Sequence, residues 1–119
     1  MEETIQTKTF AFAIDIVELS KLLMNDKREF IMSRQLLKSG TSIGANVREA
    51  QNAESKPDFI HKMGIAQKEA DETIYWLDLL NATSYLEEAQ YSSLKEKAVV
   101  ILKIIRTIII RTKSNIASN

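Results

Sequence analysis

The sequence predicts an all-α protein, built as a single domain over residues 1–119 in the form of an antiparallel up-down-up-down four-helix bundle. Apolar residues recur at steps of three and four along most of the chain, which is the spacing of one face of a helix. The chain has only three glycines and one proline, and so few helix-breaking residues favour a small number of long helices. Short connections between long helices make neighbouring helices antiparallel. The predicted helices cover residues 7–24, 27–52, 57–83 and 87–113.

The first predicted helix follows a segment, residues 1–6, that we expect to fray. It carries one apolar stripe and, nearly opposite, a second stripe of Phe10, Ala13, Ile14, Val17 and Met24. A helix that is apolar on two faces is buried on two sides, and in so small a bundle the second burial is expected at a subunit interface. The pattern leaves open which stripe is core. We assign the interface to members of the first stripe: Phe12, Ile16 and Leu19.

The second predicted helix follows a turn at Asn25 and Asp26, which are also candidate cap residues. Its middle contains Gly40 and Gly44, each of which costs about 1 kcal/mol in a helix interior relative to Ala. One interpretation is a break in the helix. The other is a continuous helix whose small residues let a neighbour approach closely. We favour the continuous helix because the apolar rhythm keeps its phase across both glycines.

The third predicted helix has a capping signature, Ser55 followed by Asp58, with Pro57 in the first turn. Its heptad seam is typical of packing against near-parallel neighbours and consists of Phe59, Met63, Ala66, Ala70, Thr73, Leu77 and Leu80. A second row lies about a third of a turn away and places large apolar residues around two carboxylates. We predict that this row contributes to a subunit interface: Ile65, Glu69, Glu72, Trp76 and Leu79.

The fourth predicted helix has a core stripe of Leu94, Ala98, Ile101, Ile105 and Ile108. Its many β-branched residues also suit a strand. A helix is favoured because Lys103 and Arg106 interrupt the run at helical spacing, and because a lone strand would have no sheet to join. Residues 114–119 are expected to form a polar tail.

The overall composition excludes several functional classes. The formal net charge is zero, so there is no global attraction to nucleic acid or to acidic membranes. No stretch reaches the roughly 18 uncharged apolar residues of a membrane span, and the acidic start of the chain is unlike a secretory signal. The chain has no cysteine, which fits a reducing cytoplasm. We therefore expect a cytoplasmic protein with no membrane association.

The residues needed for catalysis are scarce. A di-iron bundle site requires Glu-x-x-His motifs on two helices, and the only histidine, His61, has no Glu three residues before it. The sequence lacks a nucleophilic cysteine, a Gly-x-Ser-x-Gly elbow and a phosphate-binding glycine loop. We predict that the protein is not an enzyme and has no catalytic, cofactor-binding or metal-ligating residues.

The charges are uneven along the chain even though they cancel in sum. After Glu96 the chain contains no acidic residue. This pattern suits solubility and the negative C-terminal end of a helix. It also suits a basic surface for RNA or for an acidic protein partner. The candidate nucleic-acid contacts are Arg34, Lys38, Lys103, Arg106, Arg111 and Lys113.

Two polar residues of the second helix, Asn46 and Arg48, lie among small and apolar neighbours and are candidates for burial. Buried polar groups need partners. We expect Arg48 to pair with Glu69 or Glu72, either within one subunit or across an interface.

Four short pieces within residues 36–80 stand out together, namely Ser42-Ile43-Gly44-Ala45-Asn46, Glu49-Ala50, Ser55-Lys56 with Phe59, and Glu69 and Glu72 before Tyr75-Trp76-Leu77. With these pieces the segment resembles a bacterial four-helix-bundle family. Its members include proteins encoded in intervening sequences of large-subunit ribosomal RNA genes, and the accessory variability determinant proteins of diversity-generating retroelements are related.

The resemblance implies a four-helix subunit that assembles into a homopentameric barrel without an established enzymatic activity. The retroelement relatives are strongly basic and bind a reverse transcriptase and RNA, whereas this chain is neutral. We expect a non-enzymatic homo-oligomer, a pentamer by this resemblance, that serves as an interaction scaffold. The alternative is an accessory protein that binds nucleic acid through the basic residues of the second and fourth helices.

Overall fold

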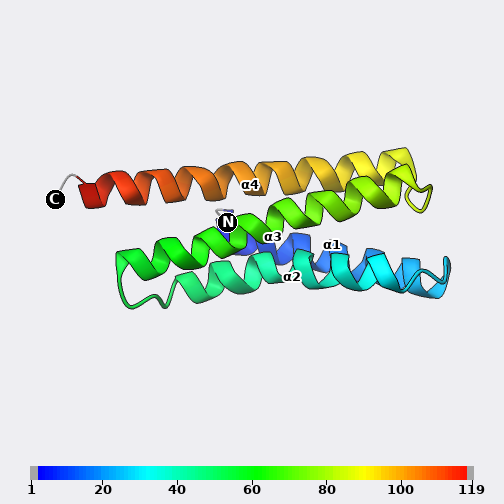
Figure 1. The fold of residues 1–119 in the computed structure, drawn as a ribbon, viewed down its shortest axis with the longest axis horizontal. Coiled ribbons are helices and arrows are strands. Elements are labelled where there is room, and N and C mark those ends of the chain that lie inside the picture. The colour runs from blue at the N-terminus through cyan, green and yellow to red at the C-terminus, as the bar shows by residue number, and fades with distance from the viewer. Residues whose placement is uncertain (1–2, 118–119) are drawn as a thin grey trace.

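Four long helices joined by short loops make up residues 3–117, the part of the chain that the structure, a computed structural model, describes (Figure 1). They are α1 (Ile5–Asn25), α2 (Ile31–Ala50), α3 (Lys56–Ala82) and α4 (Glu88–Ala117). The three connections between them lie at alternate ends of the rod (Figure 1). Within the described residues there is no strand, so the predicted all-α class is confirmed.

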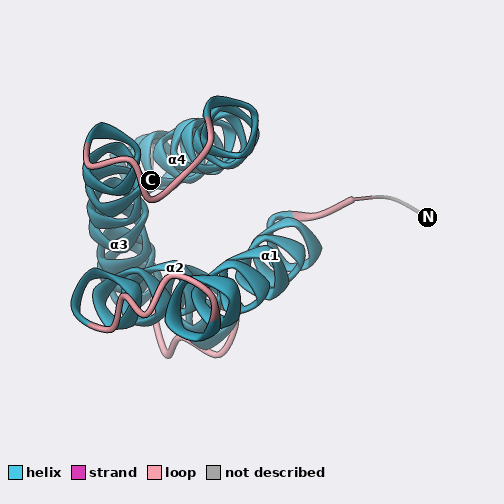
Figure 2. Ribbon diagram, turned by 90° about the vertical axis from the view of Figure 1, so that its right-hand side faces the viewer, coloured by secondary structure: helices cyan, strands magenta, loops and turns pink. Residues whose placement is uncertain are grey.

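The helices form an open layer around α2 and α3 rather than an evenly closed bundle. Close packing joins α1 to α2, α2 to α3 and α3 to α4, whereas α1 and α4 are the most loosely packed of the neighbouring helices. Viewed along the rod, the seam between α1 and α4 is the open side (Figure 2). One ion pair crosses this seam, with Lys97 Nζ 3.0 Å from Asp15 Oδ2.

α1 begins earlier than expected because two threonines cap it. The Thr7 backbone N–H donates to Thr4 Oγ1 at 3.2 Å, and the Thr4 N–H donates to Thr7 Oγ1 at 2.9 Å. Such a reciprocal pair satisfies two backbone donors that the first turn would otherwise leave free. Ile5 and Gln6 are therefore helical, which corrects the expectation that residues 1–6 fray; residues 1–2 lie outside the described part.

α2 begins at Ile31, not near Lys27, and Glu29 defines its start. The Glu29 carboxylate accepts the backbone N–H groups of Ser33 at 2.9 Å and Met32 at 3.3 Å. A negative charge at this end is also favoured by the helix dipole. Arg28 has a positive φ of 55°, so the chain turns sharply before the helix. Asn25 and Asp26 terminate α1 and do not cap α2.

The glycines of α2 lie in a continuous helix, as predicted, and they face α1. A Cβ built on Gly40 would lie 2.8 Å from Ile16 Cγ2, and one built on Gly44 would lie 3.3 Å from Thr9 Oγ1. Both distances are below ordinary van der Waals contact. The absence of side chains at these two positions is therefore what permits the close approach of α1 and α2.

α3 follows its predicted pattern closely. The Ser55 side chain accepts the Asp58 N–H at 3.1 Å, and Pro57 lies in the first turn. Most of the heptad seam is buried, and its single polar member is hydrogen-bonded to the next helix, since Thr73 Oγ1 donates to Ser39 Oγ of α2 at 3.1 Å.

α4 is helical throughout, so the alternative of a strand is wrong. It continues to Ala117, which corrects the predicted polar tail over residues 114–117; residues 118–119 lie outside the described part. A polar cluster joins it to α3, because the Tyr91 hydroxyl donates to Asp78 Oδ1 at 2.6 Å and Lys95 Nζ lies 3.0 Å from the same oxygen. Burial alone would raise the pKa of Asp78, but these two hydrogen bonds and the Lys95 charge outweigh it and lower that pKa.

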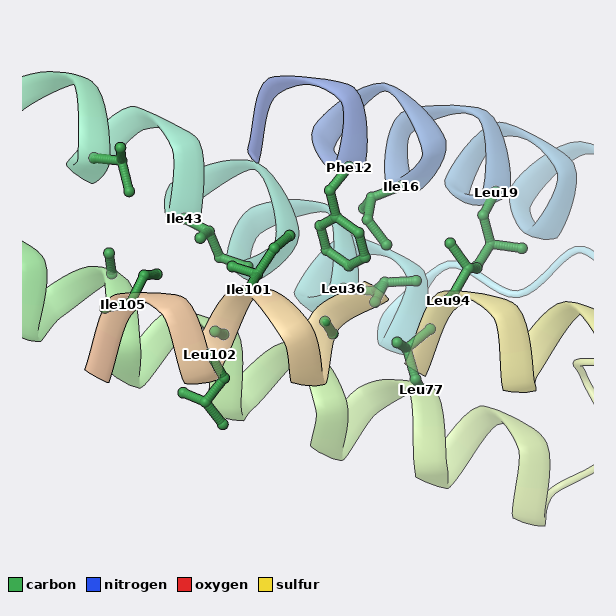
Figure 3. Packing of buried hydrophobic residues seen from close by; sticks show 14 of the residues in the cluster. Phe12, Ile16, Leu19, Leu36, Ile43, Leu77, Leu94, Ile101, Leu102 and Ile105 are labelled. Atoms are coloured by element: carbon green, nitrogen blue, oxygen red, sulfur yellow. The ribbon is translucent and has the colours of Figure 1, made fainter. Parts of the chain in front are cut away.

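One apolar core holds the four helices together, and it includes the stripe of α1 that we had assigned to an interface. Phe12, Ile16 and Leu19 are 2%, 0% and 3% exposed within the single subunit. Figure 3 shows them pointing from α1 toward core residues of α2 and α4, among them Leu36 and Ile101. Their assignment as interface residues is corrected, because side chains already enclosed by the subunit have no surface left for a second copy.

Within residues 3–117, none of the helices combines the length and the apolar character needed to cross a bilayer.

Candidate functional site

The second apolar stripe of α1 remains uncovered once the core has formed. Phe10 is 57% exposed and Ile14 is 50% exposed. Phe10 and Ala13 border a shallow groove whose other wall is α2, including Ala45 and Arg48. We call these five residues, Phe10, Ala13, Ile14, Ala45 and Arg48, the α1 face. Sequence reasoning had noted this stripe but had not assigned the interface to it, because two apolar stripes on one helix look alike until a neighbour covers one of them.

The second row of α3 forms another partly exposed surface, on the side of α3 that faces α2. Ile65, Glu69, Trp76 and Leu79 are half-buried in the subunit, and Glu72 is exposed. Lys38 of α2 acts electrostatically on Glu69, which places this row beside α2. We call these five residues, Ile65, Glu69, Glu72, Trp76 and Leu79, the α3 face.

Local contacts hold the aromatic residue of the α3 face in place. The Trp76 indole N–H donates to Glu72 Oε2 at 3.2 Å, and the Tyr75 ring meets the Trp76 ring edge-on with centroids 5.0 Å apart. Ile31, at the start of α2, is 77% exposed. It stands seven residues before Lys38 and thus on the same side of α2. Sequence reasoning missed Ile31 because it lies one position before the apolar rhythm that starts at Met32.

The two carboxylates of the α3 face influence each other. Burial raises the pKa of Glu69, the nearby Glu72 charge raises it further, and Lys38 lowers it, with a net rise above the ordinary value. A like charge one helical turn away disfavours the ionised form of Glu69. This surface therefore favours an additional cation.

The predicted burial of Arg48 is wrong for the subunit. Arg48 is exposed and lies in the groove beside α1, while Asn46 is half-buried and donates from Nδ2 to the Ser42 carbonyl at 2.8 Å. Among the ion pairs of the described residues none involves Arg48. Within one subunit, Arg48 therefore does not pair with Glu69 or Glu72.

The six candidate nucleic-acid residues are all exposed, but the structure separates them into two groups. Arg34 and Lys38 lie on α2, whereas Lys103, Arg106, Arg111 and Lys113 lie on α4. In the described part of the chain the backbones of α2 and α4 do not lie side by side. The two groups consequently do not form one continuous basic patch.

The acidic side chains and the one histidine of the described residues are dispersed. Groups of three or more acidic or histidine side chains close enough to hold a metal ion are absent from that part of the chain, and His61 is exposed. A groove of about 470 Å³ lies in the open seam between α1 and α4, and Phe12, Ile101 and the Asp15–Lys97 ion pair are among its lining residues. This ion pair bridges the two helices.

The model of the family described as 23S rRNA-intervening sequence protein matches residues 2–107. The chain belongs to that family. The family resemblance predicted from the α2 and α3 motifs is thereby confirmed, and the match extends through all four helices as far as Thr107 of α4.

A solved member of the S23 ribosomal protein family has nearly the same fold. This protein of unknown function from Bacteroides thetaiotaomicron is 50% identical, covers 89% of this chain over 98% of its own length, and superimposes with a TM-score of 0.88. Among curated proteins, none matches the chain. Membership of the intervening-sequence family thus establishes the fold and assigns no activity. The function has to be argued from the surfaces of the subunit.

Proposed function

We propose that this intervening-sequence protein is a non-enzymatic homo-oligomer that acts in the cytoplasm as an interaction scaffold. Its subunit is an antiparallel up-down-up-down bundle, and five copies form the assembly, the number that the family resemblance implies. The observation that carries the proposal is the α1 face, where Phe10 and Ile14 stay at least half exposed after the core is complete.

The exposed apolar side chains favour association energetically. Burying a phenylalanine removes about 150–250 Å² from water, and each Å² of apolar surface contributes about 25 cal/mol. Phe10 and Ile14 lie one helical turn apart, so a partner covers both at once. A stable interface buries more than about 1,000 Å² in total. The α3 face is a second partly apolar surface, with Ile65, Trp76 and Leu79, and its burial would add to the interface area.

Light scattering coupled to gel filtration tests the assembly directly. At micromolar concentration we expect a mass of five times the 13.5 kDa of one chain. Another multiple would keep the oligomer and change the copy number. A mass of one chain, in a sample whose circular dichroism shows a folded helical protein, would contradict the proposal.

A second candidate function is binding of single-stranded RNA by α4, supported by four exposed cations. Lys103, Arg106, Arg111 and Lys113 make no ion pair among the described residues. In a symmetric assembly such a patch is repeated in every copy. Arg34 and Lys38 are left out of this candidate because they lie on α2, whose backbone is not next to that of α4.

The salt dependence of RNA affinity distinguishes this second function from a pure scaffold. Binding through phosphates weakens steeply with salt, with a slope of about −0.7 per contacted phosphate on a logarithmic scale. We expect Arg106→Gln combined with Lys113→Gln to reduce that slope, and Arg34→Gln to leave it unchanged. Absence of binding at low salt, measured by fluorescence anisotropy with a labelled oligonucleotide, would exclude RNA as the ligand.

A further inference from the structure

We infer that the copies associate head to tail, with the α1 face of one subunit seated on the α3 face of the next and Arg48 of one copy paired with Glu69 and Glu72 of its neighbour. This inference rests on the proposed homo-oligomer and specifies which two surfaces meet in it.

The two faces lie on different sides of the subunit. α1 and α3 both pack against α2, and in the described part of the chain their backbones do not lie side by side. Figure 2 shows α2 at the corner, with α1 extending from it in one direction and α3 in another. The subunit therefore has two distinct faces that point in different directions around α2, and this arrangement suits a head-to-tail contact. Repeated head-to-tail contacts form a closed ring when the rotation from one subunit to the next adds up to a full turn.

The charges on the two faces are complementary. The α1 face carries the exposed cation Arg48, and the α3 face carries Glu69 and Glu72. A two-fold dimer built on one of these faces alone would bring that face against its own copy, so that Arg48 meets Arg48 or the carboxylates meet carboxylates. Such like-charge contacts are costly at an interface. Head-to-tail association instead brings the cation of one copy to the carboxylates of the next.

The α3 face has no cation of its own beside its two carboxylates, and the guanidinium of Arg48 can supply one. Glu69 is half-buried, stands next to the Glu72 charge and has Lys38 as the cation acting on it. Closing an interface over these carboxylates removes them from water, which is unfavourable unless a cation accompanies them. An arginine can serve both carboxylates because its planar group presents five N–H donors.

Apolar contacts surround this ion pair on both faces. Phe10 and Ile14 project from the α1 face, and Trp76 and Leu79 from the α3 face, with the 77%-exposed Ile31 at its edge. Buried aromatic residues near the centre of an interface usually carry most of its energy. The apolar side chains supply the association, and the charges select which face meets which.

A charge-swap experiment tests the pairing. We expect Arg48→Glu alone and Glu72→Arg alone each to lower the mass in solution to that of one chain. Combining them in one chain, R48E/E72R, restores the pairing with its sign reversed, and we expect the oligomeric mass to return. Arg106→Glu, an exposed position on α4 outside both faces, is the matched control and should keep the wild-type mass.

Circular dichroism of each variant separates dissociation from unfolding, and both substituted positions are exposed, so the subunit should stay folded. If the single variants keep the wild-type mass, or if R48E/E72R and the triple variant R48E/E69R/E72R are both folded and monomeric, the inferred pairing is wrong while the wild-type mass still supports the homo-oligomer. A monomeric wild-type protein would instead overturn the proposed function and this inference with it.

Discussion

Replacing Phe12 by alanine should lower the free energy of unfolding by about 3–5 kcal/mol, the range observed when a buried aromatic side chain is removed. Phe12 is 2% exposed and lies in the core near Leu36 and Ile101. The loss combines the transfer free energy of the ring with the cavity left behind. Phe10→Ala is the matched comparison, because it removes the same side chain two residues away on the opposite side of α1.

Phe10→Ala should leave the helical circular dichroism signal intact and reduce the mass in solution, since Phe10 is 57% exposed in the subunit. Chemical denaturation followed by circular dichroism measures the first effect, and light scattering measures the second. Both variants should be compared at the same protein concentration, because association itself stabilises the folded state. If Phe12→Ala dissociated the assembly without lowering the denaturation midpoint, Phe12 would belong to an interface and the core described here would be wrong.

Gly40→Ala should destabilise the protein, because inserting an atom into a well-packed core usually costs about 1–3 kcal/mol. A Cβ at this position would lie 2.8 Å from Ile16 Cγ2, 2.9 Å from Cγ1 and 3.2 Å from Cβ. A β-branched side chain has few alternative rotamers, so α1 has to move away from α2. The improved helix propensity of alanine, about 1 kcal/mol, offsets part of this cost.

Gly64→Ala supplies the control for helix propensity alone. Gly64 lies inside α3, and a Cβ built there would have no neighbouring atom within 4 Å. This variant should raise the free energy of unfolding by up to about 1 kcal/mol. The two substitutions are chemically identical, so the opposite signs of their effects isolate the contact between α1 and α2. Equal stabilisation by both, measured by denaturant titration, would show that Gly40 does not face a closely packed helix.

Much of the fold could be predicted because it depends on local periodicity. The heptad seam of α3, the Ser55 cap and the core stripe of α4 follow from residue spacing and from capping chemistry within a few positions. The continuity of α2 through Gly40 and Gly44 was predictable for the same reason. The α2 and α3 motifs also identified the family, since their combined residues are far more specific than any one of them.

Other features depend on tertiary contacts, which the spacing of residues along the chain does not reveal. Glu29 is one example, because a carboxylate side chain in the preceding loop caps α2 in place of the expected turn residues. Arg48 is another, since a helix position next to small residues can point toward either neighbouring helix. Its place beside α1 separates it from the carboxylates of α3 within the subunit.

The sequence by itself determined that the chain forms four helices, that α1 has two apolar sides and that the chain belongs to the intervening-sequence family. Periodicity and motifs determine these features, and both are properties of the order of residues. Only the tertiary structure decided that the Phe12 side of α1 faces inward and the Phe10 side stays exposed. The physical reason is the approach of α2. Gly40 and Gly44 admit α1 closely in one orientation, which directs Phe12 and Ile16 into the core, and that choice depends on the shapes of both helices together.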